Sequence, residues 1–273
     1  MKLLVQGREA YAYTGGKPFN PALPCVVFVH GALHDHSGWT LLARWFAHHG
    51  FSVLAVDLPG HARSAGPPLP DVESTAGWLL ALLDAAGVRQ AALVGHSMGS
   101  LIALEAAAQA PPRATRLVMM ATAYPMKVSE ALLTLAREQP LQAIDKVNTL
   151  SISSLASKPS YPGPGNWLHG LNRALMRRTQ AIALREHGVN LFEHDFGVCD
   201  RYGGGLLAAA RVAAETACPV TLILGAHDQM TPARSAGEIA AALKARVLTL
   251  RCGHLLMGEA PDAVLAALRS ALS

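Results

Sequence analysis

Charged residues are scarce in this chain of 273 residues: they make up 15% of it, against 51% for hydrophobic residues. A disordered chain needs the opposite balance, so this composition excludes extensive disorder. No uninterrupted apolar run reaches the roughly 20 residues that a membrane span needs. The N-terminal segment meets Arg8 and Glu9 too early for the apolar core of a signal peptide. We therefore expect neither export nor a membrane partner.

A contiguous basic stripe is also missing, although the formal net charge is +4. The 23 Lys and Arg residues are scattered, and their densest cluster is the pair Arg177 and Arg178. Nucleic-acid-binding proteins gather such residues on one face, so no nucleic-acid partner is expected. The four cysteines lie far apart and form no CxxC pair. That spacing favours reduced thiols in a cytoplasmic protein over disulfides or a metal site.

Short apolar runs alternate with helical patterns along most of the chain. Four of the runs are almost continuously apolar, as expected for parallel strands covered on both faces. This alternation predicts an α/β fold with a mostly parallel, doubly wound sheet, and residues 3–14 add an antiparallel hairpin at one edge. The expected strands of the main sheet lie in residues 24–31, 51–60, 91–97, 115–123, 219–226 and 245–253.

Residues 125–198 break this rhythm. They contain two or three helical patterns and no convincing strand, with a loop rich in proline and glycine expected at 157–167. The segment therefore predicts an insertion between two strands rather than a separate sheet domain. The core is expected to comprise residues 1–124 and 199–273.

The stretch GHSMGS, residues 95–100, stands between an apolar run and an alanine-rich helical pattern. In a G-x-S-x-G motif the two glycines relieve crowding at a sharp strand-to-helix turn, which lifts the serine oxygen clear of the sheet. Alone the motif is a weak signal, because glycine and serine are common. Its flanks, AALV and LIALEAAA, supply the strand and the helix that it requires. The pattern predicts that Ser97 is a nucleophile.

A serine hydroxyl needs a base to remove its proton, and the base needs a group to orient it. His254 follows the last expected strand, and Asp228 follows the strand before it, in GAHDQMTP. Each could be an ordinary loop or turn residue. Their order after Ser97 and their positions beyond strand ends nevertheless favour the roles of general base and orienting acid.

An acyl-transfer site also needs donors for the oxyanion. Gly31, in HGALHDHSGW, permits tight backbone geometry, so the N–H of Ala32 can point toward the serine. Together with the N–H of Met98, at the start of the helix after the serine, it is expected to form an oxyanion hole.

With these residues the chain resembles the α/β-hydrolase fold family over essentially its whole length. Ala62 stands where that family usually has glycine, a change we expect to be tolerated, and His61 and Ser64 are structural marks rather than catalytic residues. The resemblance implies that residues 125–198 form a helical cap over the site. The motifs that carry it are His30-Gly31, DLPGHARS at 57–64, GHSMG at 95–99, Asp228 in GAHD and His254 in CGH.

Serine at the nucleophile position disfavours the family's dehalogenases and epoxide hydrolases, which use aspartate. We expect a serine hydrolase that acts on a small-to-medium carboxylic ester, a small-molecule substrate, without a cofactor. A carbon–carbon bond hydrolase for vinylogous diketones is the first alternative. Lactonase, thioesterase and perhydrolase activities stay open because they would use the same triad. A non-catalytic ligand receptor on the same scaffold is the alternative of another class.

Residues for substrate binding are expected in the loop after the first central strand and in the insertion. In LNRALMRRTQAI, Arg178 shares helical spacing with Leu171 and Leu175, so it either packs its stem along an apolar stripe or clamps a substrate carboxylate. Phe192 and Phe196 are expected in the core of the cap. The candidate substrate-binding residues are Leu33, His34, Trp167, Leu175 and Arg178.

The sequence His34-Asp35-His36 has an H-x-H spacing that can chelate a metal. It has no obvious third protein ligand nearby, and the hydrolase hypothesis needs no metal. We therefore expect no metal site, with His34 or Asp35 lining the substrate pocket instead.

Overall fold

The computed structural model describes residues 1–153, 164–215 and 218–273, with the backbone alone at 164–166. Across these residues eight strands form one sheet, in the order β1-β2-β4-β3-β5-β6-β7-β8. β3 to β8 run parallel, and the hairpin β1–β2 joins antiparallel at one edge, which confirms the predicted fold class. The strands are β1 (Lys2–Val5), β2 (Arg8–Tyr13), β3 (Cys25–Val29), β4 (Ser52–Val56), β5 (Ala91–His96), β6 (Ala114–Met120), β7 (Val220–Gly225) and β8 (Arg246–Leu250).

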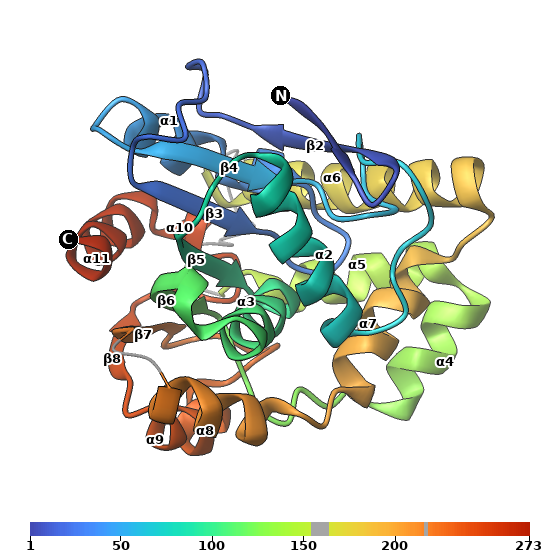
Figure 1. Cartoon of the computed structure of the whole chain (residues 1–273). Coiled ribbons are helices and arrows are strands. Elements are labelled where there is room, and N and C mark those ends of the chain that lie inside the picture. Colours follow the sequence, from blue (N-terminus) through green and yellow to red (C-terminus); the bar gives the residue numbers. More distant parts are fainter. Residues whose placement is uncertain (154–163, 216–217) are drawn as a thin grey trace.

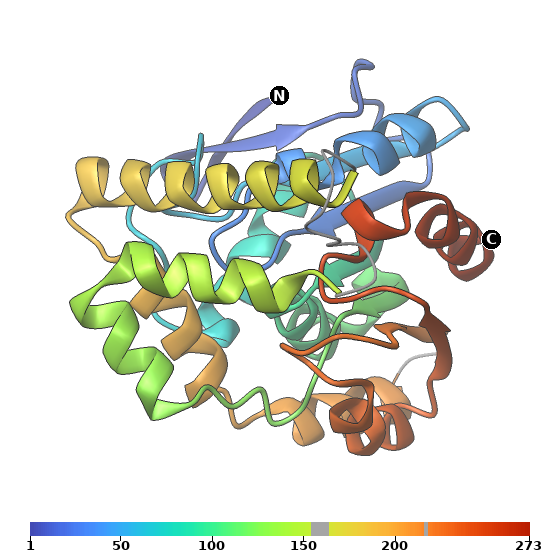
Figure 2. The same ribbon diagram turned by 180° about the vertical axis from the view of Figure 1, so that it is seen from behind.

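Helices cover both faces of the sheet because alternate side chains of each strand point to opposite faces. In β3, Val27 packs in the cluster that contains α2, α3, α8 and α9, whereas Phe28 packs in the cluster that contains α1 and α11. Figures 1 and 2 show the two layers from opposite sides. The helices of the core are α1 (Thr40–Ala47), α2 (Val72–Ala85), α3 (Met98–Gln109), α8 (Gly205–Glu215), α9 (Gly237–Ala242), α10 (Leu256–Glu259) and α11 (Pro261–Leu272).

Four further helices lie between β6 and β7: α4 (Glu130–Glu138), α5 (Pro140–Ser151), α6 (Pro164–His187) and α7 (Leu191–Arg201). They form a layer beside the carboxyl ends of the strands (Figure 2) and share an apolar cluster that includes Ile144, Met176 and Phe192. We call these four helices the cap. The last of them extends three residues beyond the expected end at 198.

The loop expected at 157–167 is described only in part. Residues 157–163 lie outside the described residues, whereas 164–167 form the first turn of α6 instead of a loop. Proline at the first helical position explains the difference, since its missing N–H would have no partner there in any case.

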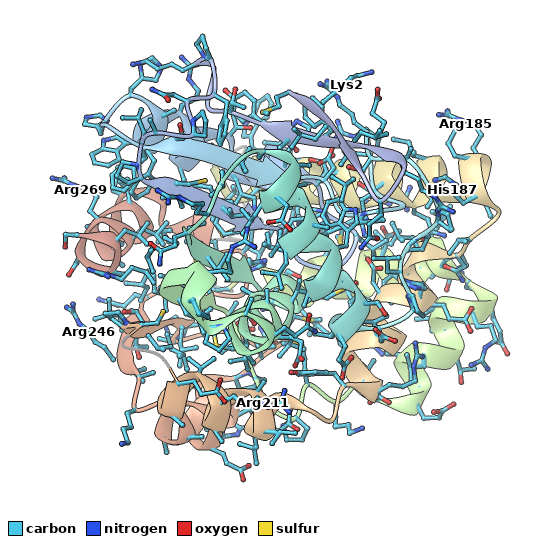
Figure 3. All side chains as sticks on the ribbon, viewed as in Figure 1. Lys2, Arg185, His187, Arg211, Arg246 and Arg269 are labelled. Carbon is cyan, nitrogen blue, oxygen red and sulfur yellow. The ribbon has the colours of Figure 1, made fainter. Side chains whose placement is uncertain are left out.

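Basic side chains are spread over the surface. Figure 3 shows Lys2, Arg185, Arg246 and Arg269 at separate places near the margin of the molecule and Arg211 over its lower part. Of the helices that the structure describes, none combines the length and the apolar character that crossing a membrane would require.

Candidate active site

Ser97 stands on the turn between β5 and α3, with φ 52° and ψ −122°. A non-glycine residue in this region of φ costs on the order of 1–3 kcal/mol, so the surrounding structure must hold it there. Two backbone contacts require the glycines of the motif: a Cβ on Gly95 would collide with the carbonyl of Gly99, and a Cβ on Gly99 with the carbonyl of Val29. The Ser97 N–H donates to the Met120 carbonyl at 2.8 Å, which fixes the turn to β6.

His254 and Asp228 lie beyond β8 and β7 and meet at the carboxyl edge of the sheet. The Nδ1–H of His254 donates to Oδ2 of Asp228 at 2.8 Å, and both residues are buried. This contact leaves Nε2 as the histidine nitrogen that can take a proton. Because His254 and Ser97 line the same cavity, the structure brings the three predicted residues together.

The carboxylate of Asp228 accepts hydrogen bonds on both oxygens. Oδ1 accepts the backbone N–H groups of Met230 and Thr231, each at 2.8 Å, while Oδ2 accepts the Thr231 hydroxyl in addition to His254. Burial acts to raise the pKa of Asp228, but the neighbouring His254 and these hydrogen bonds outweigh it and lower the pKa below its ordinary value. Asp228 is therefore ionised at neutral pH.

The two predicted oxyanion donors are backbone N–H groups of residues close to Ser97. Gly31 lies against the serine turn, where an added Cβ would be 3.2 Å from Cβ of Ser97, and Ala32 follows it in the wall of the cavity. Met98 is the first residue of α3, so its N–H has no carbonyl one turn earlier in the helix. Among the hydrogen bonds of the described residues outside helices and strands, none uses the Ala32 N–H.

His96 and His30 form hydrogen bonds with the backbone of the segments that carry His254 and Gly31. Nε2–H of His96 donates to the His254 carbonyl at 2.9 Å, and burial lowers the pKa of His96 to about 3, so its ring is neutral. His30 accepts the Leu58 N–H on Nε2 at 3.1 Å and donates from Nδ1 to the Gly31 carbonyl at 2.8 Å. Burial lowers the pKa of His30 to about 4. Both histidines act as neutral hydrogen-bonding groups.

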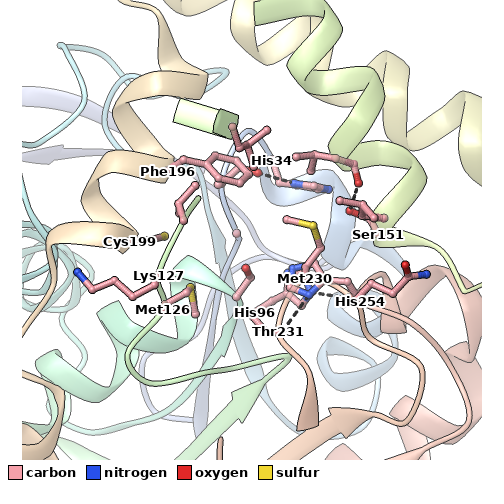
Figure 4. A pocket seen from close by; sticks show the side chains of 18 of the residues that line it. His34, His96, Met126, Lys127, Ser151, Phe196, Cys199, Met230, Thr231 and His254 are labelled. Atoms are coloured by element: carbon pink, nitrogen blue, oxygen red, sulfur yellow. Dashed lines mark hydrogen bonds between the residues drawn. The ribbon is translucent and has the colours of Figure 1, made fainter. Parts of the chain in front are cut away.

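The cavity around Ser97 has a volume of about 240 Å³ and lies between the sheet and the cap (Figure 4). Apolar side chains from the cap and from the loops that precede α4 and follow β7 dominate its lining. Figure 4 shows the amine of Lys127 turned away from the centre, and Nζ donates to the Asp200 carbonyl at 2.6 Å. The apolar lining comprises Met126, Val128, Leu132, Val147, Leu150, Met176, Phe196 and Met230.

A family model of the α/β-hydrolase fold matches residues 24–261. The chain belongs to this family. In structure, the α/β hydrolase is similar to an enol-lactonase from Burkholderia xenovorans, with a TM-score of 0.82 and 21% identity over 100% of this chain and 99% of the other. It is also similar to 2-hydroxy-6-oxo-6-phenylhexa-2,4-dienoate hydrolase from Rhodococcus, with a TM-score of 0.76 and 21% identity over 99% and 97%.

Among curated proteins, this α/β hydrolase is similar to 2-succinyl-6-hydroxy-2,4-cyclohexadiene-1-carboxylate synthase from Salmonella typhimurium. The two are 36% identical over 102 residues, which is 37% of this chain and 40% of that relative. The match thus spans well under half of either protein.

The five candidate substrate-binding residues of this hydrolase fall into different places. Of the five, His34 lines the cavity around Ser97. Leu33 is fully buried in the apolar cluster of the cap, and Trp167 is 69% exposed. Leu175 and Arg178 line a separate groove between α1, α6 and α11. Arg178 forms an ion pair there with the buried Asp35, so its charge already has a partner.

The apolar stripe predicted for α6 has the right period, but Leu171 and Leu175 line the groove beside α1 and α11 rather than the interior of the cap. Leu171 is 65% exposed, whereas Asn172, Met176 and Thr179 are buried. The side-chain oxygen of Asn172 lies 2.9 Å from Nε2 of His34. The buried face of α6 is therefore partly polar, and the hydrophobic pattern alone would assign the buried face of this helix incorrectly.

In the described part of the chain, Asp35, His36 and Asp57 form a group whose oxygen and nitrogen atoms lie within 4.8 Å of one another. These atoms already have partners. Asp35 accepts hydrogen bonds from Ser37 and Arg178, and Asp57 accepts the backbone N–H and the Nδ1–H of His36. His34 is not a member, since its ring nitrogens face the Ala32 carbonyl and Asn172. A metal would have to displace this network.

Two residues beside the site were not predicted from the sequence. Thr231 holds the Asp228 carboxylate; its position three residues after an aspartate is a recognisable side-chain turn signal. Asp195, on α7, accepts the N–H of Leu33 at 2.9 Å. No pattern in the sequence connects those two residues, which are 162 positions apart.

Proposed function

We propose that this α/β hydrolase cleaves small-to-medium, largely apolar carboxylic esters through an acyl-enzyme on Ser97. The observation that carries the proposal is the meeting of a strained serine and the histidine of a buried histidine–aspartate pair at one largely apolar cavity, with Ala32 in its wall. The buried, unpaired thiols of Cys25, Cys199 and Cys252 support work in a reducing compartment such as the cytoplasm.

The proposed reaction follows from these positions. Ser97 Oγ attacks the ester carbonyl carbon while Nε2 of His254 takes the hydroxyl proton, and the carbonyl π electrons move to the oxygen. The N–H groups of Ala32 and Met98 stabilise that oxyanion, each by about 2.7–4 kcal/mol in the transition state. His254 then protonates the leaving alcohol as the C–O bond breaks. Water attacks the acyl-enzyme by the same steps and releases the carboxylic acid and free Ser97.

The lining of the cavity supports an uncharged acyl group. Of the described residues that line it, Lys127 is the one with a permanently cationic side chain, and its amine is bonded to the Asp200 carbonyl. An acidic substrate would bury its charge without a paired cation, at a cost of several kcal/mol. The names of the similar dienoate hydrolase and carboxylate synthase both denote carboxylates, so a carbon–carbon bond reaction is the weaker alternative for this cavity.

A fluorophosphonate probe tests the proposal. We expect it to label the wild-type protein on Ser97, and Ser97→Ala to abolish both labelling and ester hydrolysis. A panel of p-nitrophenyl esters, with a lactone, a thioester and a vinylogous diketone, then separates the chemistries that share this triad. Failure to label any serine, with no turnover in the panel, would favour a non-catalytic receptor.

A further inference from the structure

The turn that carries the Ala32 N–H is attached to the cap through its neighbour, Leu33. The side chain of Leu33 is fully buried in the apolar cluster of the cap, and its backbone has φ 59°, a conformation unusual for a branched residue. Its N–H donates to Oδ2 of Asp195, on α7, at 2.9 Å. One residue of the core thus contacts the cap with both its side chain and its backbone.

These contacts fix the peptide group between Ala32 and Leu33 at both ends. Its N–H donates to Asp195, and its carbonyl accepts the Nδ1–H of His34 at 2.8 Å. The His34 N–H also donates to the Gly31 carbonyl at 3.2 Å, which closes the turn. The Ala32 N–H belongs to the preceding peptide group, which is joined to this one at Cα of Ala32. A displacement of the held peptide would therefore also move the Ala32 N–H.

Asp195 is buried and charged, and it serves more than one partner. Its Oδ2 also accepts Nε2–H of His61 at 3.0 Å, and its Oδ1 accepts Nδ1–H of His194 at 3.1 Å. Burial acts to raise the pKa of Asp195, but His61 and His194 hold that pKa well below its ordinary value. Hydrogen bonds to an ionised acceptor are about twice as strong as neutral ones, so the carboxylate holds the Leu33 N–H firmly.

We propose that Asp195 is a positioning residue through which the cap sets the direction of the Ala32 donor in the oxyanion hole. The proposal rests on the proposed serine-hydrolase function. The oxyanion hole is complete when α7 is docked on the turn at 31–34, and it loses one aligned donor when that contact is removed.

Two variants of Asp195 test this role by the rate of acylation with a p-nitrophenyl ester. Asp195→Ala removes the acceptor, and we expect kcat to fall on the order of 10²-fold while KM changes little, because the donor acts on the transition state. Asp195→Asn keeps an oxygen for the Leu33 N–H, so we expect it to restore most of the rate. Asp200→Ala is the matched control: Asp200 lies on the same helix and accepts the Val128 N–H at 3.0 Å, outside the oxyanion turn. We expect its kcat to remain close to that of the wild type.

Hydrogen exchange of the Leu33 amide tests the same contact without catalysis. We expect this amide to be protected in the wild type and in Asp195→Asn, and to exchange at least about tenfold faster in Asp195→Ala. Rapid exchange in the wild type would overturn the proposal even if Asp195→Ala does not fold. A folded Asp195→Ala with wild-type kcat, or an equal fall of kcat in Asp200→Ala or Asp195→Asn, would also overturn it. If Ser97 is not labelled at all, the proposed function fails, while the exchange measurement still decides whether Asp195 holds the turn.

Discussion

Replacing Asp228 by asparagine should disable His254 by giving it the wrong tautomer. Oδ1 of Asp228 accepts two backbone N–H groups, from Met230 and Thr231, so an asparagine must place its oxygen there. Its NH₂ group then faces Nδ1 of His254, which in the native protein donates to Oδ2 at 2.8 Å. The imidazole can satisfy this donor only by accepting on Nδ1 and carrying its proton on Nε2. That nitrogen could no longer take the proton of Ser97.

The expected fall in kcat is about 10⁴-fold, as for the equivalent change in serine proteases. This corresponds to roughly 5.5 kcal/mol in the barrier, at 1.36 kcal/mol for each factor of ten. The assay is p-nitrophenyl ester turnover, with the thermal unfolding midpoint measured alongside. We expect the midpoint to change little, because the asparagine retains both backbone hydrogen bonds. Asp200→Asn is the control, since Asp200 has no contact with His254.

A rate near that of the wild type would refute the argument. It would mean that another carboxylate orients His254, and Glu259 would be the next to test. Glu259 accepts the N–H of Gly253, directly before His254, at 3.0 Å.

Four further results are expected. With p-nitrophenyl esters of increasing acyl length, activity should rise roughly fourfold for each added methylene and then fall once the cavity is full. Met176→Ala, in the cavity wall, should move this maximum to longer acyl chains. Leu175→Ala, in the adjacent groove, should leave the maximum where it is. Prolonged EDTA treatment followed by desalting should leave ester hydrolysis unchanged, and restoration of lost activity by one divalent ion would contradict this. Both ring nitrogens of His61 face oxygens, and although burial acts to lower the pKa of His61, Asp195 raises it above the ordinary 6.5. The contribution of this contact to the free energy of unfolding should therefore be complete below pH 6.5 and be lost as the pH rises through the raised pKa. Urea titrations at several pH values should show this loss in the wild type and not in His61→Gln. Ala62 has φ 43°, so Ala62→Gly should increase the free energy of unfolding by up to about 1 kcal/mol, and a loss of stability in chemical denaturation would show that the methyl group packs favourably.

The strands and the positions of Ser97, Asp228 and His254 beyond strand ends could be predicted because each depends on local sequence. A buried parallel strand needs a continuous apolar run, and the serine turn needs Gly95 and Gly99 at fixed offsets because backbone atoms approach each other there. The polar groups that follow β7 and β8 then meet at one edge of the sheet by topology alone. These constraints leave a clear signal in a single sequence.

The cap was harder to predict because its side chains respond to neighbours far away in the sequence. The buried face of α6 carries Asn172 and Thr179, whose polar groups find partners inside, while Leu171 is exposed. A hydrophobicity pattern predicts the opposite, with Leu171 buried and the two polar residues exposed. The partner of Arg178 is Asp35, 143 residues earlier, so the spacing within the helix does not reveal that the charge is already paired.

The attachment of the cap also bears on protein engineering. The cap leaves the core after β6 and returns to it at α8, and its two ends lie close together, since the Tyr124 hydroxyl donates to the Gly203 carbonyl at 2.5 Å. That arrangement suits exchange of the whole segment between related scaffolds. A transplanted cap would need to supply a carboxylate at the position of Asp195 and an apolar recess for Leu33. Grafts chosen for their fit to a new substrate, but without these two groups, should fold and bind yet turn over slowly.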